Sequence, residues 1–185
     1  MEDKQIIDLY WNRSEQAISE TDTKYGPYCY KIAYNILMNK EDSEESVYDT
    51  YMDEWNAMPP HRPSLLASFL GKITRRISID RWRGRTAAKR GGTETALALD
   101  ELEWCVADSR ILEDEMDRKE LIRTINHFLG SLTVTERRVF LQRYWAMESI
   151  EDIAVTYNFS QSKVTSMLYR TRKKLRNTLE KEGFR

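Results

Sequence analysis

Apolar residues recur at helical spacing near the end of the chain, and they predict two helices joined by a tight turn over residues 149–175. Ser149 and Ser160 precede the two helices, and serine is a favoured N-cap because its hydroxyl accepts a free backbone N–H. Asn158 lies where the chain must turn, and asparagine tolerates the left-handed conformation better than most residues. The apolar stripe of the second helix consists of Val164, Met167, Leu168, Thr171 and Leu175.

The opposite face of the second helix carries small polar, aromatic and cationic residues and no carboxylate. It consists of Ser162, Lys163, Thr165, Ser166, Tyr169, Arg170 and Lys173. A helix with such a face fits the major groove of DNA, where it can bond to base edges and to phosphates. An ordinary helical hairpin with a solvated basic face is the alternative interpretation of this pattern.

The same helical periodicity extends over most of the chain, and no alternating pattern typical of strands is found. Seven glycines and four prolines among 185 residues also favour a fold built of helices. We therefore predict an all-α protein with two small helical domains, residues 1–90 and residues 117–185, the second ending in the helix-turn-helix. The segment 91–116 is weakly periodic and is predicted to be a flexible, partly helical linker. Gly26-Pro27 predicts a break within the first domain.

The charges are segregated along the chain, although the net charge of −1 gives no general argument for nucleic-acid binding. Residues 41–54 carry seven acidic residues and no basic one. Residues 72–90 carry eight basic residues against one acid, and residues 160–185 carry eight against two. This pattern predicts one acidic docking surface and two basic surfaces. A basic partner would explain the acidic helix, and a merely solvated acidic face is the alternative.

The first basic segment overlaps a helix predicted over residues 64–83, which follows a proline-rich loop at residues 56–63. One face of this helix is apolar. Its second face combines cations with an aromatic ring, at Lys72, Arg75, Arg76, Trp82 and Arg83. Cations interleaved with an aromatic side chain suit a nucleic-acid strand, through phosphate contacts and base stacking.

Other classes of function find little support in the sequence. Cys29 and Cys105 lack metal-binding spacing and an activating histidine pattern, and His61 and His127 are isolated. The acids of residues 41–54 are segregated from the bases, whereas metal-dependent cleavage of nucleic acid needs carboxylates within a basic cleft. We therefore expect no enzymatic activity, no metal and no cofactor. No signal peptide or long apolar run is found, which predicts a cytoplasmic protein without membrane insertion.

Four stretches of the chain together resemble the bacterial RNA polymerase sigma factors of the extracytoplasmic-function (ECF) type. They are residues 34–55, 69–83, 132–140 and 153–175. Many regulators share the helix-turn-helix alone, but its combination with the acidic helix and the basic–aromatic helix, in this order, is specific. The resemblance implies a protein that binds core RNA polymerase, recognises a promoter, melts the DNA and so initiates transcription.

The resemblance also assigns residues to each of these steps. Docking on core polymerase falls on Asp42, Glu45, Asp49, Tyr51, Asp53 and Trp55. The melted strand of the proximal promoter element would be held by Asn56, His61, Arg62, Lys72, Arg75, Arg76, Trp82 and Arg83. The distal element would be read as duplex by Arg143, Lys163, Thr165, Ser166, Tyr169, Arg170 and Lys173. The resemblance places Arg143 at a position that touches the DNA backbone, and it implies an anti-sigma protein as a further partner.

The chain departs from the family pattern at Arg76, where an asparagine usually contacts the captured strand, and at the double proline Pro59-Pro60. An arginine can replace a base contact with a phosphate contact, which lowers sequence readout. Two other interpretations stay open: a dimeric helix-turn-helix regulator that binds a palindrome, and an adaptor that binds polymerase without reading DNA. The acidic residues 94–117 could also lie against a basic DNA-binding surface and restrain it.

Overall fold

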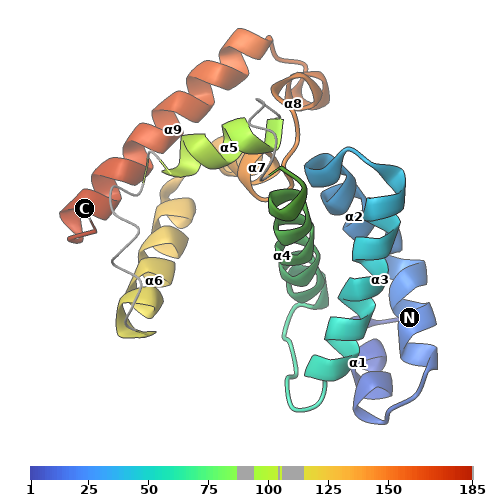
Figure 1. Cartoon of the computed structure of the whole chain (residues 1–185). Coiled ribbons are helices and arrows are strands. Elements are labelled where there is room, and N and C mark those ends of the chain that lie inside the picture. The colour runs from blue at the N-terminus through green and yellow to red at the C-terminus, as the bar shows by residue number, and fades with distance from the viewer. Residues whose placement is uncertain (87–93, 104, 106–114, 185) are drawn as a thin grey trace. The chain divides into compact units, whose positions relative to one another are not determined.

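The computed structural model of the chain describes residues 1–86, 94–103, 105 and 115–184, and its regular elements are α-helices. In chain order they are α1 (Asp3–Trp11), α2 (Gln16–Leu37), α3 (Lys40–Ala57), α4 (Leu66–Thr86), α5 (Glu94–Glu103), α6 (Glu115–Ser131), α7 (Val134–Tyr144), α8 (Ile150–Tyr157) and α9 (Gln161–Lys181) (Figure 1). These described ranges contain no strand, and the predicted all-α fold is confirmed. No helix within them is both long enough and apolar enough to cross a bilayer.

The chain divides into two compact units, Met1–Gly91 and Gly92–Arg185. In the first unit α2, α3 and α4 pack against one another, and α1 packs on α2. The core of this unit gathers Ile6, Tyr10, Cys29, Tyr51, Met58, Leu66 and Leu70. Because burial of apolar side chains releases water, this core provides the main driving force that holds the four helices together. The predicted domain boundary between residues 90 and 91 lies outside the described residues.

Helix α2 continues through Gly26-Pro27, so the predicted break at this dipeptide is wrong. Pro27 lies on the exposed side of the helix, where its missing N–H is tolerated more easily. Gly26 is buried against α3, and a Cβ atom at this position would lie 3.4 Å from the Tyr51 hydroxyl. The packing of α2 on α3 therefore outweighs the helix-breaking tendency of the dipeptide.

The second unit contains α5 to α9, and α8 and α9 are the predicted helix-turn-helix. The Ser149 hydroxyl accepts the backbone N–H of Asp152 at 3.0 Å, and the Ser160 hydroxyl accepts that of Lys163 at 3.2 Å. Asn158 ends α8 in the left-handed conformation, with φ 52° and ψ 45°. Caps and turn are therefore as the sequence predicts. Buried side chains in this unit include Val139, Phe140, Ile153, Val164, Leu168, Leu175 and Leu179.

Part of the segment predicted as a linker forms helix α5, which contacts α7. Thr95 and Ala98 are buried on its inner side, and Cys105, just beyond its end, is buried too. The predicted linker residues 91–93, 104 and 106–114 lie outside the described residues. An acidic helix is thus part of the same unit as the helix-turn-helix.

Candidate nucleic-acid interface

The face of α9 that is predicted to read DNA is open to solvent. Its exposed side chains are Lys163, Thr165, Ser166, Tyr169, Arg170 and Lys173. The opposite stripe of the helix is buried in the core of the second unit. Lys163 Nζ lies 3.4 Å from the centre of the Phe159 ring, a cation–π contact that orients this charge at the start of the helix. The α9 surface therefore offers hydroxyls, an aromatic ring and cations with the dimensions that a major groove admits.

Arg143, predicted to touch the DNA backbone, is only 1% exposed. Its Nη1 donates to Glu94 Oε2 at 2.6 Å and to the carbonyl oxygen of Glu148 at 3.1 Å. A buried guanidinium is costly unless it is paired and hydrogen-bonded, and these acceptors serve Nη1, whereas Nε lies 3.8 Å from Glu101 Oε2 and makes no hydrogen bond to the described residues. Arg143 is therefore held by α5 and by the turn before α8, and its contact with DNA stays a prediction.

Glu101 of α5 forms a second polar cluster with α7 and α9. Arg172 Nη1 donates to Glu101 Oε2 at 3.0 Å and to the Tyr144 hydroxyl at 2.5 Å. The Tyr144 hydroxyl donates to the same carboxylate oxygen at 2.7 Å. Burial, followed by the bond to Glu101, raises the pKa of Tyr144 well above its usual value, so the phenol remains a donor. No sequence motif assigns a role to Glu94, Glu101 or Arg172, and only the opposed charges of the two segments pointed to them.

The acidic helix α3 meets basic partners inside its own unit, on α4. The ion pairs are Arg76–Asp53, Arg81–Glu45, Arg81–Asp49 and Arg85–Asp42. Arg81 joins two turns of α3, with its Nη2 at 2.6 Å from Asp49 Oδ2. Four of the acids predicted to dock on polymerase therefore have intramolecular partners. No sequence motif assigns a role to Arg81 or Arg85, although the opposite charges of residues 41–54 and 72–90 contained the signal.

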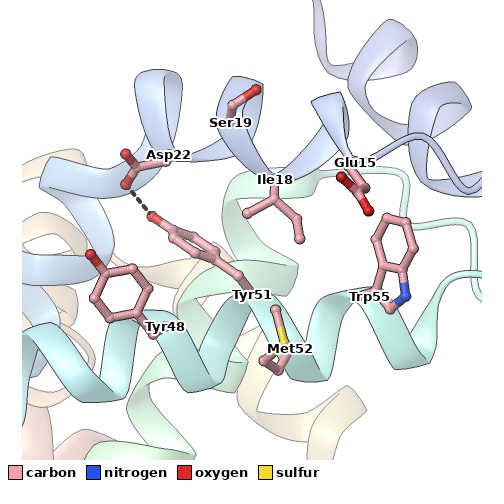
Figure 2. A pocket seen from close by; sticks show the side chains of 8 residues that line it. All are labelled: Glu15, Ile18, Ser19, Asp22, Tyr48, Tyr51, Met52 and Trp55. Atoms are coloured by element: carbon pink, nitrogen blue, oxygen red, sulfur yellow. Dashed lines mark hydrogen bonds between the residues drawn. The ribbon is translucent and has the colours of Figure 1, made fainter.

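An open groove between α2 and α3 contains the two aromatic residues predicted for polymerase docking. It is lined by Glu15, Ile18, Ser19, Asp22, Tyr48, Tyr51, Met52 and Trp55 (Figure 2). The Tyr51 hydroxyl donates to Asp22 Oδ1 at 2.8 Å, which fixes the ring between the two helices. Tyr48 and Met52 are 68% and 50% exposed, so the groove presents apolar surface to solvent beside the carboxylates of α2. A partner that fits it must combine apolar side chains with cations.

The residues predicted to hold a melted strand lie on α4 and on the loop before it, except Asn56, which lies in the last turn of α3 and not in the predicted loop. Asn56, His61, Arg62, Lys72, Arg76 and Arg83 are exposed, while Arg75 and Trp82 are half-buried. Burial lowers the pKa of Arg75, and the nearby charge of Arg83 lowers it further. Arg62 pairs with Asp8, and its guanidinium carbon lies 5.4 Å from the centre of the Trp11 ring. The fold thus brings most of these residues onto one helix, but it ties Arg62 to α1 and Arg76 to α3.

The acidic, cysteine and histidine side chains of the described residues form no metal-type cluster, and the two cysteines are buried. Within these residues, no group of three or more His, Cys, Asp or Glu side chains could hold a metal ion. Cys29 and Cys105 are free and buried, and burial raises the pKa of each thiol to about 11. Thiols of this kind stay protonated near neutral pH and are poor nucleophiles. The chemistry that these residues do offer is recognition through charge, hydrogen bonding and stacking.

Two comparisons with known proteins agree with the geometry of the second unit. Residues 122–175, which contain α7, α8 and most of α9, match the family Sigma-70, region 4. Over 156 residues the chain is 26% identical to the ECF RNA polymerase sigma factor SigX of Bacillus subtilis (strain 168). The chain is therefore similar to an ECF sigma factor over most of its length. The alignment covers 82% of this chain and 77% of SigX, so the resemblance predicted from the sequence is confirmed.

A solved structure described as CnrH in complex with the cytosolic domain of CnrY is also similar to this chain. The two share 18% sequence identity, and the comparison covers 98% of this chain and 99% of the matched chain of that structure, with a TM-score of 0.44.

Proposed function

We propose that this chain is a sigma factor that acts in the cytoplasm, binds core RNA polymerase, recognises a two-part promoter and melts the DNA for transcription initiation. The observation that carries the proposal is the match of residues 122–175 to sigma-70 region 4. The exposed, acid-free face of α9 within this match supports it. The second unit would read the distal element as duplex, and the first would dock on polymerase and hold the melted proximal strand. An anti-sigma partner is a further part of this proposal.

Sequence readout of the distal element would fall on the middle of the α9 face. The hydroxyls of Thr165 and Ser166 can bond to several base edges, and Arg170 can make a paired contact with a guanine. Lys163 and Lys173 lie toward the two ends of this face, where flanking phosphates would run. The central residues would therefore set specificity, and the two lysines would mainly set affinity.

Docking on core polymerase is best supported at the groove between α2 and α3. The exposed Tyr48 and Met52 favour an apolar partner surface, and the carboxylates of Glu15 and Asp22 favour a cationic one. An amphipathic, basic helix of the polymerase has both properties. Tyr51, Trp55 and their neighbours would form the groove wall, while the acids paired with α4 would hold α3 in position.

Capture of the melted strand is best supported along α4. Lys72 and Arg83 are exposed on this helix and can reach phosphates. Arg76 would exchange its carboxylate partner Asp53 for a phosphate. This exchange is inexpensive because the two side chains are 62% and 43% exposed, and solvent-exposed ion pairs contribute only about 0–1 kcal/mol.

Run-off transcription with core polymerase across a genomic promoter library tests this function. The double variant Ser166→Ala with Arg170→Ala should reduce transcription from the selected promoters about tenfold or more, because each base contact contributes about 1–3 kcal/mol. The matched control is Asn177→Ala with Lys181→Ala, which removes one polar and one cationic side chain from the exposed end of the same helix. The control should retain transcription.

Two outcomes would reject this proposal in favour of the other interpretations. Tight binding of the free protein to a palindromic duplex, without dependence on core polymerase, would identify a dimeric regulator. Binding to polymerase with unchanged transcription of the Ser166 and Arg170 variant at every promoter would identify an adaptor that does not read DNA.

A further inference from the structure

Helix α5 precedes the region 4 match and places carboxylates on cations of the DNA-binding unit. We infer that α5 is an intramolecular competitor of DNA, and that the basic surface of the second unit is complete only after α5 has moved away. Glu94 and Glu101 would occupy Arg143 and Arg172 in place of DNA phosphates. The inference rests on the proposed function, in which this unit binds the distal promoter element.

The side of α5 that faces the rest of the second unit carries both Glu94 and Glu101, so both can contact Arg143 and Arg172 at the same time. Glu94 and Glu101 are seven residues apart, which is close to two helical turns, and both therefore lie on one side of the helix. Ala98, between them on that side, is buried. Asp100 and Glu103 are exposed, so the helix carries two acids toward the unit and two toward solvent.

The carboxylate of Glu101 occupies a position that suits a phosphate. Its Oε2 lies 3.0 Å from Arg172 Nη1 and 3.8 Å from Arg143 Nε, and it accepts the Tyr144 hydroxyl at 2.7 Å. A phosphate oxygen at the same point would meet the same two guanidinium groups and the same phenol. Arginine guanidinium groups and side-chain hydroxyls are the usual protein partners of DNA phosphates.

Arg172 borders the face of α9 that is predicted to read the bases. At about 100° per residue it lies only about 20° around the helix from Thr165 and about 60° from Tyr169. Phosphates of a duplex read by these residues would therefore pass close to the edge that α5 occupies. Displacement of α5 would add Arg172, and with it Arg143, to the exposed cations of α9.

The apolar attachment of α5 is weak compared with its charged contacts. The side chains that it buries fully, Thr95 and Ala98, are small, and none of its three leucines is fully buried. Small side chains remove little apolar area from water, so their release costs little hydrophobic free energy. Phosphates that compete for the two arginines can therefore displace the helix.

The double variant Glu94→Gln with Glu101→Gln tests this competition in the full chain. Glutamine keeps a hydrogen-bond acceptor and nearly the same shape, but it removes the charge that holds each arginine. The matched control is Asp100→Asn with Glu103→Gln, which changes the net charge equally on the solvent side of α5. Affinity for the duplex selected in the run-off assay is measured by fluorescence anisotropy, after circular dichroism has shown that each variant is folded.

A second measurement, the alkylation rate of Cys105, reports on the detachment of α5 in the absence of DNA. Cys105 is buried at the end of α5, where its sulfur lies 3.9 Å from the carbonyl oxygen of Arg172, so an alkylating reagent reaches it only when this contact opens. Mass spectrometry of the peptide that contains Cys105 separates its labelling from that of Cys29. The Glu94 and Glu101 variant should be labelled about tenfold faster and should bind the duplex about fivefold tighter or more, because two charge-assisted contacts are lost. The control variant should match the wild-type chain in both measurements.

The outcomes separate the inference from the function on which it rests. Unchanged labelling of Cys105 in the Glu94 and Glu101 variant, or faster labelling without tighter duplex binding, overturns the competition. An equal gain in affinity for the control variant overturns it as well, because net charge would then account for the effect. If the wild-type chain and both variants fail to bind the duplex even with core polymerase, the proposed function itself is rejected.

Discussion

Glu54 is a buried carboxyl in the core of the first unit, and we predict that Glu54→Gln removes a pH dependence from the stability of that unit. Its side chain is 0% exposed, and its Oε2 accepts the Tyr10 hydroxyl at 2.6 Å. Its Oε1 has no hydrogen-bond partner among the described residues. Burial raises the pKa of Glu54 to about 8, although the bond from Tyr10 acts in the opposite direction. The carboxyl is therefore mostly protonated at neutral pH.

The size of this pH dependence follows from the difference between the pKa of Glu54 in the folded state and in the unfolded chain. The folded pKa of about 8 lies above the ordinary value of 4.5, so the folded state binds this proton more tightly than the unfolded chain does. The resulting stabilisation is fully present below about pH 4.5 and is lost as the pH rises toward about 8. Between pH 5 and pH 7 the loss amounts to about 2 to 3 kcal/mol of unfolding free energy. Glutamine resembles the protonated acid but does not titrate.

Urea unfolding of the full chain at the two pH values measures this difference. The fluorine resonances of fluorotryptophan at Trp11 and Trp55 report on the first unit, since both residues belong to it. Between pH 5 and pH 7 the unfolding free energy of the wild-type chain should fall by about 2 to 3 kcal/mol more than that of the Glu54→Gln variant. Asp53→Asn, which changes a neighbouring, partly exposed carboxyl, should lose as much unfolding free energy as the wild-type chain. Parallel stability profiles of the wild-type chain and the Glu54 variant would refute the reasoning.

The cap of α9, the α2–α3 groove and the α3–α4 ion pairs each give a further prediction. Ser160→Ala should lower the stability of the second unit by about 1 kcal/mol in thermal unfolding, whereas Ser160→Asp should preserve it, because only the second retains an N-cap acceptor. Tyr48→Ala with Met52→Ala should weaken binding to core polymerase about tenfold. The control Val155→Ala, which changes an exposed apolar side chain in the other unit, should leave this binding unchanged. Equal losses of polymerase affinity in the two variants would argue against docking at the groove. Arg81→Met should destabilise the first unit by about 1 kcal/mol in low salt and by less in about 1 M salt, and a salt-independent loss would point to packing instead.

The helix-turn-helix could be predicted because all of its signals are local. The two serine caps, the left-handed Asn158 and the apolar stripe lie within one short segment, and each acts on its own neighbours in sequence. Periodicity also predicted the exposed face of α9, since one buried stripe leaves the opposite side free. These features needed no information about the rest of the fold.

The partners of the charged residues could not be predicted in the same way. Helical periodicity shows that Asp49 and Arg81 occupy surfaces, but it does not show that α3 and α4 bring those surfaces together. The burial of Arg143 depends on α5, whose weak periodicity suggested a linker. The break expected at Pro27 failed for a related reason, because the packing of α2 on α3 is not visible in a local pattern.

The ion pair between Arg76 and Asp53 affects how the proposed strand capture should respond to salt. A free cation that neutralises a DNA phosphate releases a condensed counterion, which makes affinity fall as salt rises. Arg76 is already neutralised, and its transfer to a phosphate frees a carboxylate that attracts a cation from solution. The ion released from the strand and the ion taken up by the protein then largely cancel. Arg76 would thus exchange one anionic partner for another with little net release of ions. The affinity of the first unit for the strand would therefore depend on salt less than its number of cations suggests.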